Sequence, residues 1–413
     1  MRLAIHRPPG LVLTEHEFEV PLDHSRPDAT KLTLFAREVV GTERAGEALP
    51  WLLFLQGGPG FEAARPLSRR DPTWLEPALR RYRVLMLDQR GTGRSSPVGD
   101  MAGLTAREQA DRLAFFRADA IVRDAEAVRG ALGIDRWTVL GQSFGGFCVV
   151  SYLSLAPHGL DAALVTGGLP PLERHVDDVY SATYRRVVDR NRAYYARYPE
   201  DRDRVRAIVE RLDAGDVRLP TGERLSARRF RQLGMLLGTS TGAERLHYIV
   251  ELPVDSPAFR HDVAAESPFA RNPLYAVVHE ACYASGCVTR WSAERVMPDE
   301  LRADETMFTG EHVFPWMFEE IDALAPLREA AHLLAERPWP PLYDPETLLQ
   351  NRVPAAALVY ADDMYVERSF SEETAARVRG LRAWVTNEYE HDGLRADGGR
   401  VLGRLLELLD GTA

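Results

Sequence analysis

The sequence predicts an α/β fold, in which a mostly parallel sheet flanked by helices carries an inserted, mainly helical cap domain. Three observations predict it. Short apolar runs of strand type alternate with helical patterns in the N-terminal and C-terminal parts of the chain. From residue 171 to about residue 342, helical patterns and proline-rich loops replace the strand signals. At residues 137–156 a strand-like run, a glycine-flanked turn and a helical run follow one another directly.

The first part of the core is expected to span residues 1–170. It opens with residues 18–22 and 31–40, whose alternating apolar and polar pattern predicts a β-hairpin. Further strands are expected at residues 51–55, 83–87, 137–140 and 161–168. One long helix is predicted over residues 105–132, and Gly133 ends it before the next strand.

The cap is expected over residues 171–344, and the core resumes over residues 345–413. Leu169-Pro170-Pro171 interrupts the core pattern, and Trp339-Pro340-Pro341 marks the return. An insertion between two core strands is expected to have this appearance, with helices and few strand signals of its own. The second part of the core contains strand-like runs at residues 355–360 and 384–386 and an amphipathic helix over residues 400–409.

The pentad Gly141-Gln142-Ser143-Phe144-Gly145 lies where the strand-like run 137–140 meets the helical run 147–156. Glycines on both sides of a serine suit a sharp turn that leaves no room for side chains beside the exposed hydroxyl. GxSxG also occurs as an ordinary glycine-serine turn. The strand before it and the helix after it favour the catalytic interpretation, so Ser143 is the predicted nucleophile.

A serine nucleophile needs a histidine base and a carboxylate, here in the chain order Ser, acid, His. Asp362-Asp363 follows the strand-like run 355–360, and His391 follows the run 384–386. Carboxyl ends of parallel strands meet at one sheet edge, so these residues can meet Ser143 there. Asp363 is preferred because it extends one residue further into the loop, which leaves Asp362 as a solvated turn residue. The alternative for His391 is a surface loop histidine.

Two backbone N–H groups are expected to form an oxyanion hole. One belongs to Phe144, the residue after the nucleophile, and the other to the glycine-rich loop Gln56-Gly57-Gly58-Pro59-Gly60 after the strand at 51–55. Gly58 is the preferred second donor and Gly57 its alternative. Each such donor supplies on the order of 3 kcal/mol of transition-state stabilisation. A glycine-rich turn without a binding role is the competing interpretation.

Residues 88–95, Asp-Gln-Arg-Gly-Thr-Gly-Arg-Ser, also follow a strand-like run and superficially resemble a nucleotide-binding loop. The third glycine of that fingerprint is absent and no P-loop lysine follows. We therefore expect a structural segment, in which Asp88 forms ion pairs with Arg90 or Arg94.

Composition narrows the possible partners. A formal net charge of −10 disfavours nucleic acid and anionic membranes, and Lys31 is the only lysine. No segment approaches the ~20 apolar residues of a membrane span, and the apolar run at the N-terminus is too short for a signal peptide. Cys148, Cys282 and Cys287 form no even framework and no metal-binding pair, so reduced thiols and a cytoplasmic enzyme are expected. Neither a metal ion nor another cofactor is predicted.

Four motifs together resemble those of the proline iminopeptidases, or prolyl aminopeptidases, of the α/β-hydrolase fold. They are residues 55–60, 88–95, 141–146 and 387–393. Residues 275–291, with the pair His279-Glu280, and residues 361–366 also resemble the longer-chain bacterial branch of that family. The loop at 55–60 departs from the commoner family pattern, which has histidine where this chain has Gln56.

The resemblance implies release of an N-terminal proline, or a similar small residue, from a small peptide substrate through an acyl-enzyme on Ser143. It also implies a cap whose carboxylates bind the free ammonium of the substrate, and a buried ammonium does require such a partner. Glu280, beside Tyr275 and Tyr283, is the first candidate, and Glu311 is the second. For both, a solvated surface carboxylate is the alternative.

Other functions compatible with the same residues are a carboxylester hydrolase or other small-acyl amidase and, from another class, a catalytically idle ligand-binding protein. An epoxide hydrolase or haloalkane dehalogenase is disfavoured because those enzymes need a carboxylate where this chain has Ser143. No feature of the sequence indicates the oligomeric state.

Overall fold

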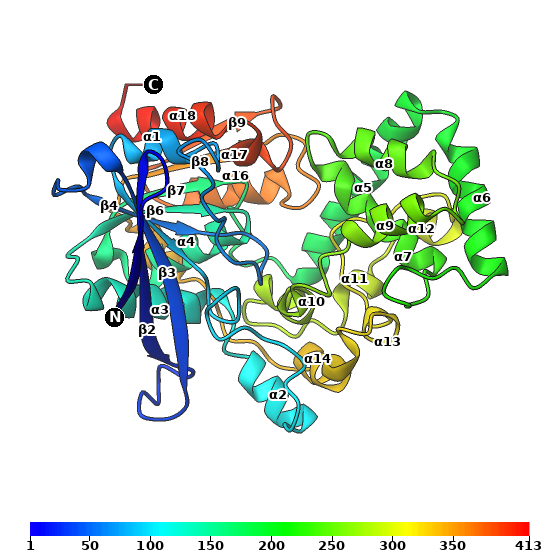
Figure 1. Cartoon of the computed structure of the whole chain (residues 1–413), viewed down its shortest axis with the longest axis horizontal. Coiled ribbons are helices and arrows are strands. Elements are labelled where there is room, and N and C mark those ends of the chain that lie inside the picture. The colour runs from blue at the N-terminus through cyan, green and yellow to red at the C-terminus, as the bar shows by residue number, and fades with distance from the viewer. Residues whose placement is uncertain (413) are drawn as a thin grey trace.

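A computed structural model describes residues 1–412 and contains one nine-stranded sheet in the order β1-β2-β3-β5-β4-β6-β7-β8-β9 (Figure 1). The strands are β1 (Arg2–His6), β2 (Leu11–Pro21), β3 (Lys31–Gly41), β4 (Trp51–Leu55), β5 (Arg83–Leu87), β6 (Trp137–Gln142), β7 (Leu160–Thr166), β8 (Ala355–Tyr360) and β9 (Leu381–Thr386). The pairs from β5 through β4 and β6 to β9 are parallel, whereas β1, β2 and β3 join at one edge in antiparallel order. The predicted α/β fold with a mostly parallel sheet is confirmed.

The antiparallel edge contains the predicted hairpin. β2 and β3 pair over their full lengths, from Leu11 opposite Gly41 to Pro21 opposite Lys31. The sequence pattern located the hairpin but missed residues 11–17 of β2 and the whole of β1, which is mostly exposed.

Alternate residues of the central strands enter two separate hydrophobic layers. In β4, Leu53 and Leu55 face a layer with α3 and α4, while Leu52 and Phe54 face one with α1 and α18. Both faces of the sheet are therefore covered, which explains the nearly continuous apolar runs in the sequence. The helices of this core are α1 (Leu75–Leu79), α2 (Ala106–Leu113), α3 (Ala118–Ala131), α4 (Phe144–Leu155), α15 (Pro345–Leu349), α16 (Arg368–Arg377), α17 (Gly393–Ala396) and α18 (Gly398–Asp410).

The prediction of one long helix over residues 105–132 is wrong, because the chain breaks into α2 and α3. Arg117 adopts an extended backbone, and Phe116 is buried in the core beside this break. The break directs α2 away from the sheet to pack against α14 (Arg328–Ala335) (Figure 1). Helical periodicity alone does not reveal such a break, because tertiary contacts determine it.

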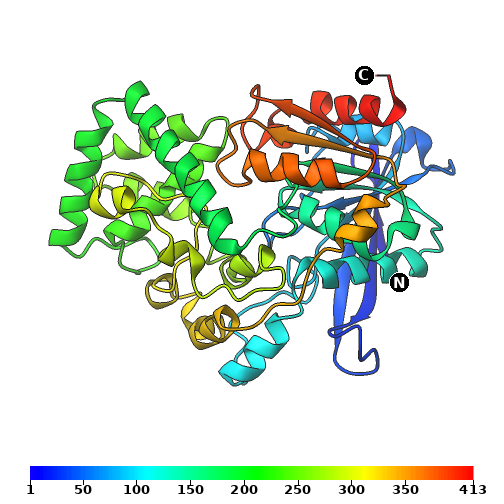
Figure 2. The ribbon, with the colours of Figure 1, turned by 180° about the vertical axis from the view of Figure 1, so that it is seen from behind.

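Between β7 and β8 the chain leaves the sheet and forms a second body of mainly short helices, set to one side of the sheet (Figures 1 and 2). Its helices are α5 (Val176–Arg197), α6 (Asp201–Ala214), α7 (Ala227–Arg231), α8 (Gly242–Val250), α9 (Pro257–Ala265), α10 (Pro273–Val278), α11 (Ser292–Arg295), α12 (Asp299–Ala303), α13 (Met317–Glu320) and α14. β7 and β8 are nevertheless neighbours in the sheet. We call this second body the cap.

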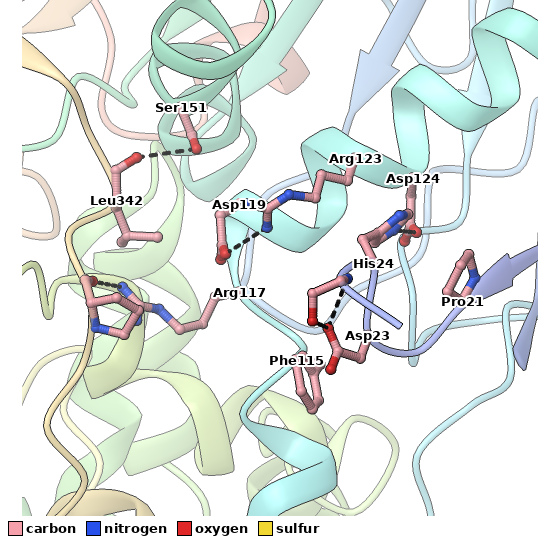
Figure 3. A network of polar contacts seen from close by, with 12 residues as sticks. Pro21, Asp23, His24, Phe115, Arg117, Asp119, Arg123, Asp124, Ser151 and Leu342 are labelled. Carbon is pink, nitrogen blue, oxygen red and sulfur yellow. Dashed lines mark hydrogen bonds and ion pairs between the residues drawn. The ribbon is translucent and has the colours of Figure 1, made fainter. Parts of the chain in front are cut away.

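Buried hydrogen bonds join the cap to the core. The guanidinium of Arg117, just before α3, donates to the carbonyl oxygen of Ala284 at 2.5 Å and to that of Pro340 at 3.3 Å. The Ser151 hydroxyl, on α4, donates to the Leu342 carbonyl oxygen at 3.3 Å (Figure 3). These side chains anchor two segments of the cap, one at Ala284 and the other the returning segment at residues 340–342, to the core.

The ion pairs expected for the 88–95 segment have different partners in the structure. Arg90 is buried and binds Asp124 of α3, with Nε 2.6 Å from Oδ2. His24 binds the same carboxylate at 2.9 Å, and both His24 and Asp124 are labelled in Figure 3. Asp88 instead accepts the backbone N–H of Arg94 at 3.0 Å, and burial raises its pKa. Arg90 and Arg94 form ion pairs with neighbouring segments, through Asp124 and Glu15, but the expected pairing of Asp88 with an arginine is wrong. Within residues 1–412, no helix is both long and apolar enough to cross a bilayer.

Candidate active site

Ser143 lies at the tip of a tight turn between β6 and α4, with φ of 55° and ψ of −125°. The surrounding glycines are required by close backbone contacts. A Cβ on Gly141 would lie 2.3 Å from the Gly145 carbonyl oxygen, and one on Gly145 would lie 2.0 Å from that of Leu55. A Cβ on Gly168 would lie 2.1 Å from the carbonyl oxygen of Ser143 itself. These contacts hold Ser143 in a strained conformation that presents its hydroxyl at the sheet edge.

The structure brings Ser143, His391 and Asp363 into one hydrogen-bonded chain. His391 Nε2 lies 2.8 Å from Ser143 Oγ, and its Nδ1 lies 2.7 Å from Asp363 Oδ2. The three residues follow β6, β9 and β8, whose carboxyl ends lie along the same edge. This is the geometry that a histidine base needs to accept a serine proton while a carboxylate fixes its tautomer.

The two neighbouring aspartates occupy different environments. Asp363 is 1% exposed, and its second oxygen accepts the backbone N–H groups of Tyr365 at 2.8 Å and Val366 at 3.1 Å. Asp362 lies at the surface and makes an ion pair with Arg186 at 3.4 Å. Only Asp363 is therefore placed and oriented to act on His391.

The imidazole of His391 is buried between core and cap. Burial acts to lower its pKa, but the charge of Asp363 and the hydrogen bond to it outweigh that effect, so the pKa is raised. The Tyr365 ring packs edge-on against the imidazole, with the ring centroids 4.8 Å apart. The backbone N–H of His391 donates to the carbonyl oxygen of Gly238 in the cap at 3.1 Å. The structure thus favours the imidazolium that forms when His391 accepts a proton.

The predicted oxyanion donors border the same site. Phe144 is the first residue of α4, so its N–H is one of the helix N-terminal donors without an intrahelical partner. The loop after β4 passes beside the nucleophile, because a Cβ on Gly57 would lie 2.8 Å from the Cβ of Ser143. Gly58 follows with a φ of 134°, which favours glycine.

A cavity of about 270 Å³ opens beside Ser143 between the core and the cap. Its core wall includes Gly57, Gly58 and His391. Its cap wall includes aliphatic and aromatic side chains together with two acids, the principal residues being Met235, Leu236, Glu266, Pro268, Tyr275 and Glu311. A cavity of this size suits a small apolar group with one polar end.

Glu311 faces this cavity, with its side chain 17% exposed. Its carboxylate accepts a hydrogen bond from the Tyr275 hydroxyl at 2.6 Å and lies 3.9 Å from His279 Nε2. Burial acts to raise the pKa of Glu311, but interactions with His279 and Tyr275 outweigh it, so the pKa is lowered. The cap therefore presents a carboxylate that stays ionised on the wall opposite the catalytic residues.

Glu280, the first candidate from the sequence, does not line the cavity. Its Oε1 accepts the backbone N–H of Ala293 at 2.9 Å and so caps the start of α11. The other carboxylate oxygen is buried and has no hydrogen-bond partner in the described chain. Burial raises the pKa of Glu280. Both glutamates lie among aromatic residues, but their contacts differ. Glu280 is used within the cap, and only Glu311 is available to a ligand.

Sequence reasoning missed two charged residues that line the cavity. Glu266 already has a partner, Arg245. Arg395 lies on α17, four residues after His391, and has no ion-pair partner among residues 1–412. Its spacing from His391 is the one signal that could have suggested it, since a helix starting at Gly393 keeps residue 395 close to the site.

One group of side chains elsewhere has the composition of a metal site. Glu200, Asp201 and His247 place possible ligand atoms within 4.8 Å of one another in the cap. Asp201 already accepts hydrogen bonds from Tyr194, from His247 at 2.8 Å and from Arg204 at 2.7 Å. A guanidinium in this position supplies the positive charge that a cation would supply, so the group is explained as an ion-pair network.

The fold and the arrangement around Ser143 define the class of protein, a serine hydrolase. The alpha/beta hydrolase fold family matches residues 50–266 of the chain. Among solved structures, a proline iminopeptidase of Mycobacterium smegmatis is 18% identical, with a TM-score of 0.48 over 96% of this chain and 98% of that one.

Two relatives match the chain over nearly its whole length. A proline iminopeptidase of Aeromonas sobria is 48% identical over 97% of each chain. A proline iminopeptidase of Aspergillus aculeatus is 37% identical over 98% of this chain and 95% of that one. The chain therefore belongs to the proline iminopeptidase family, as the sequence motifs indicated.

Proposed function

We propose that this protein is a serine exopeptidase that releases an N-terminal proline, or a similar small residue, from peptides. One arrangement carries the proposal. The hydrogen-bonded residues Ser143, His391 and Asp363 lie on one wall of a cavity of about 270 Å³, and the ionised carboxylate of Glu311 lies on the opposite wall. A peptide that presents its free N-terminus there can bring its first carbonyl group to the serine. Membership of the proline iminopeptidase family supports the choice of proline.

In the first half of the reaction, His391 Nε2 accepts the proton of the Ser143 hydroxyl while its oxygen attacks the carbonyl carbon. The backbone N–H groups of Phe144 and Gly58 stabilise the oxyanion of the tetrahedral intermediate, with Gly57 as the alternative second donor. The imidazolium, held by Asp363, then protonates the leaving nitrogen. Cleavage of the C–N bond leaves the prolyl group esterified to Ser143.

In the second half, water takes the place of the leaving amine. His391 accepts a proton from this water, and the hydroxide attacks the ester carbonyl. The second tetrahedral intermediate collapses, His391 returns the proton to Ser143, and free proline leaves. Asp363 stays ionised throughout and fixes the tautomer of the imidazole.

Glu311 is the proposed partner of the substrate ammonium. An ammonium transferred from water into this cavity needs an ionised partner, because an unpaired, desolvated charge is strongly unfavourable. The lowered pKa of Glu311 keeps it charged, and the hydrogen bond from Tyr275 fixes its orientation. Glu280 has no such role, since its bonded oxygen caps α11 and its pKa is raised.

Glu311 also distinguishes this function from that of a carboxylester hydrolase or a small-acyl amidase with the same catalytic residues. Those enzymes accept uncharged acyl groups, and an ionised carboxylate facing the acyl site offers such a group no complementary charge. The site thus favours a substrate with a cationic amine next to the scissile carbonyl group.

The three cysteines suggest where the enzyme works. Cys148, Cys282 and Cys287 are all unpaired, and the first two are buried. Because reducing compartments maintain free thiols, we infer a cytoplasmic location.

A panel of amino-acyl aryl amides tests the proposal, each with a free and with an acetylated amino group, alongside an aryl ester. We expect the free prolyl amide to be the best amide substrate and its acetylated form to be inert. Equal rates for free and blocked amides would contradict an exopeptidase and support an esterase or endopeptidase. No turnover of any member would support an idle binding protein.

A further inference from the structure

A second cavity of about 580 Å³ adjoins the active-site cavity on the core side. The two share Gln56, Phe61, Gln142 and Arg395 as lining residues, so these side chains form the boundary between them. The cap residue Glu311 lines only the first cavity. The site therefore has two compartments, of which one contains the carboxylate of the cap and the other leads away from it.

Reaction geometry assigns these compartments to the two halves of the substrate. The acyl half must lie toward Glu311 if that carboxylate binds the ammonium. The leaving nitrogen must lie beside His391 Nε2, because His391 protonates it. His391 leads directly into α17, which carries Arg395. The leaving peptide therefore passes from His391 across Arg395 into the second cavity.

The second cavity is lined by apolar residues together with charged residues whose formal charges do not cancel. Its apolar residues include Phe61, Leu67, Trp74 and Leu394; Leu67 is 77% exposed, whereas Trp74 and Leu394 are buried. An apolar side chain of a bound peptide can cover such a surface.

The charged residues that line it are Glu62, Asp71, Arg65, Arg271 and Arg395, which gives a formal excess of one positive charge. Glu62 is already paired with Arg271, and Arg65 lies 3.8 Å from it. Arg395 has no ion-pair partner within residues 1–412, although Arg400 on the following helix pairs with Glu388. A guanidinium with free donors beside a peptide channel is suited to bind a carboxylate.

We propose that Arg395 is a specificity-determining residue that binds the carboxylate of the leaving peptide, so that the enzyme prefers short peptides with a free C-terminus. The substrate class is a proline followed by one or a few residues, the first of them apolar. This inference rests on the proposed exopeptidase function and adds the identity of the leaving group.

The test compares prolyl-leucine, which has a free carboxylate, with prolyl-leucinamide, which has none. For the wild-type enzyme we expect kcat/KM to favour the free carboxylate by about fivefold to tenfold, as for a partly exposed ion pair with good geometry. Arg395→Gln should bring the ratio close to one. Arg395→Lys, which keeps the charge, should retain part of the preference, and Arg395→Glu should reverse it.

Arg400→Gln is the matched control, because it removes a nearby arginine that lines neither cavity and should leave the ratio at its wild-type value. Thermal melting shows whether each variant is folded, and a ratio of two substrates is insensitive to the amount of active enzyme. A wild-type ratio of one or below, or an unchanged ratio in Arg395→Gln, overturns the inference. If the wild-type enzyme fails to cleave a prolyl aryl amide, the exopeptidase function itself fails, and that result is distinct from an unchanged ratio.

Discussion

The two walls of the active-site cavity are built by different means. On the core wall, Ser143, Asp363 and His391 each follow a strand of one sheet, and backbone contacts fix their positions. On the cap wall, Glu311 lies in an irregular segment between α12 and α13, and side chains from another segment, Tyr275 and His279, hold it. The comparison teaches that regular backbone positions the proposed reacting groups, whereas side-chain packing positions the carboxylate proposed to select the substrate.

The largest expected effect belongs to the core wall. Ser143→Ala should lower kcat/KM for a prolyl aryl amide by about 10,000-fold or more, because the nucleophile is lost. Steady-state kinetics measures the loss. Ser154→Ala, in the same helix but outside the site, is the control and should keep the activity. If Ser143→Ala kept activity comparable to that of the wild-type enzyme, Ser143 would not be the nucleophile.

The two adjacent aspartates provide the next test. Asp363→Asn should lower kcat by about 1,000-fold to 10,000-fold, because an amide favours the wrong tautomer of His391. Asp362→Asn changes the same side chain one residue away, at the surface, and should leave kcat within about twofold of wild type. Equal losses in the two variants would contradict the assignment of Asp363.

On the cap wall, the two glutamates form a matched pair. Glu311→Gln should lower kcat/KM for prolyl aryl amide by about 100-fold or more, since it leaves the substrate ammonium without a charged partner. Glu280→Gln keeps the cap on α11 and should change kcat/KM by less than about threefold. The opposite ranking in steady-state assays would restore Glu280 as the ammonium site.

A smaller effect links the two walls through pH. The negative charge of Glu311 helps to raise the pKa of His391, although burial and Asp363 have larger effects on it. Since only neutral His391 can accept the serine proton, activity is lost as pH falls through this pKa. Glu311→Gln should lower the pKa, so the acid limb should move to lower pH.

The rate of Ser143 labelling by a fluorophosphonate measures this limb without involving a substrate amine. The wild-type limb should lie above the pH at which an ordinary histidine titrates, about 6.5. A limb that moves to higher pH in Glu311→Gln would show that the two walls are not coupled as the structure indicates.

The core half of the site was predictable from sequence because its turn at Ser143 is fixed locally and its three side chains each follow a strand in a set chain order. The glycines around Ser143 predict a turn that has no room for side chains. The chain order of serine, acid and histidine limits the partners of Ser143 to a few loop residues. The structure brings Ser143, Asp363 and His391 together, and it places Gly58 and Phe144 beside them.

The cap half was not predictable to the same degree. Glu280 and Glu311 both lie among aromatic residues, and only tertiary packing makes one a helix cap and directs the other into the cavity. The break between α2 and α3 was missed for the same reason, since it depends on contacts with the cap. The residue type of Arg395 did not mark it as a site residue, and only its spacing from His391 could have done so.

The most direct measurement of the central claim is the ratio of kcat/KM for prolyl aryl amide to that for its acetylated form, in the wild-type enzyme and in Glu311→Gln. If the core wall supplies the reaction and the cap wall selects the free amine, the wild-type ratio is large and the variant ratio falls toward one. A large ratio that survives the substitution unchanged would contradict the account.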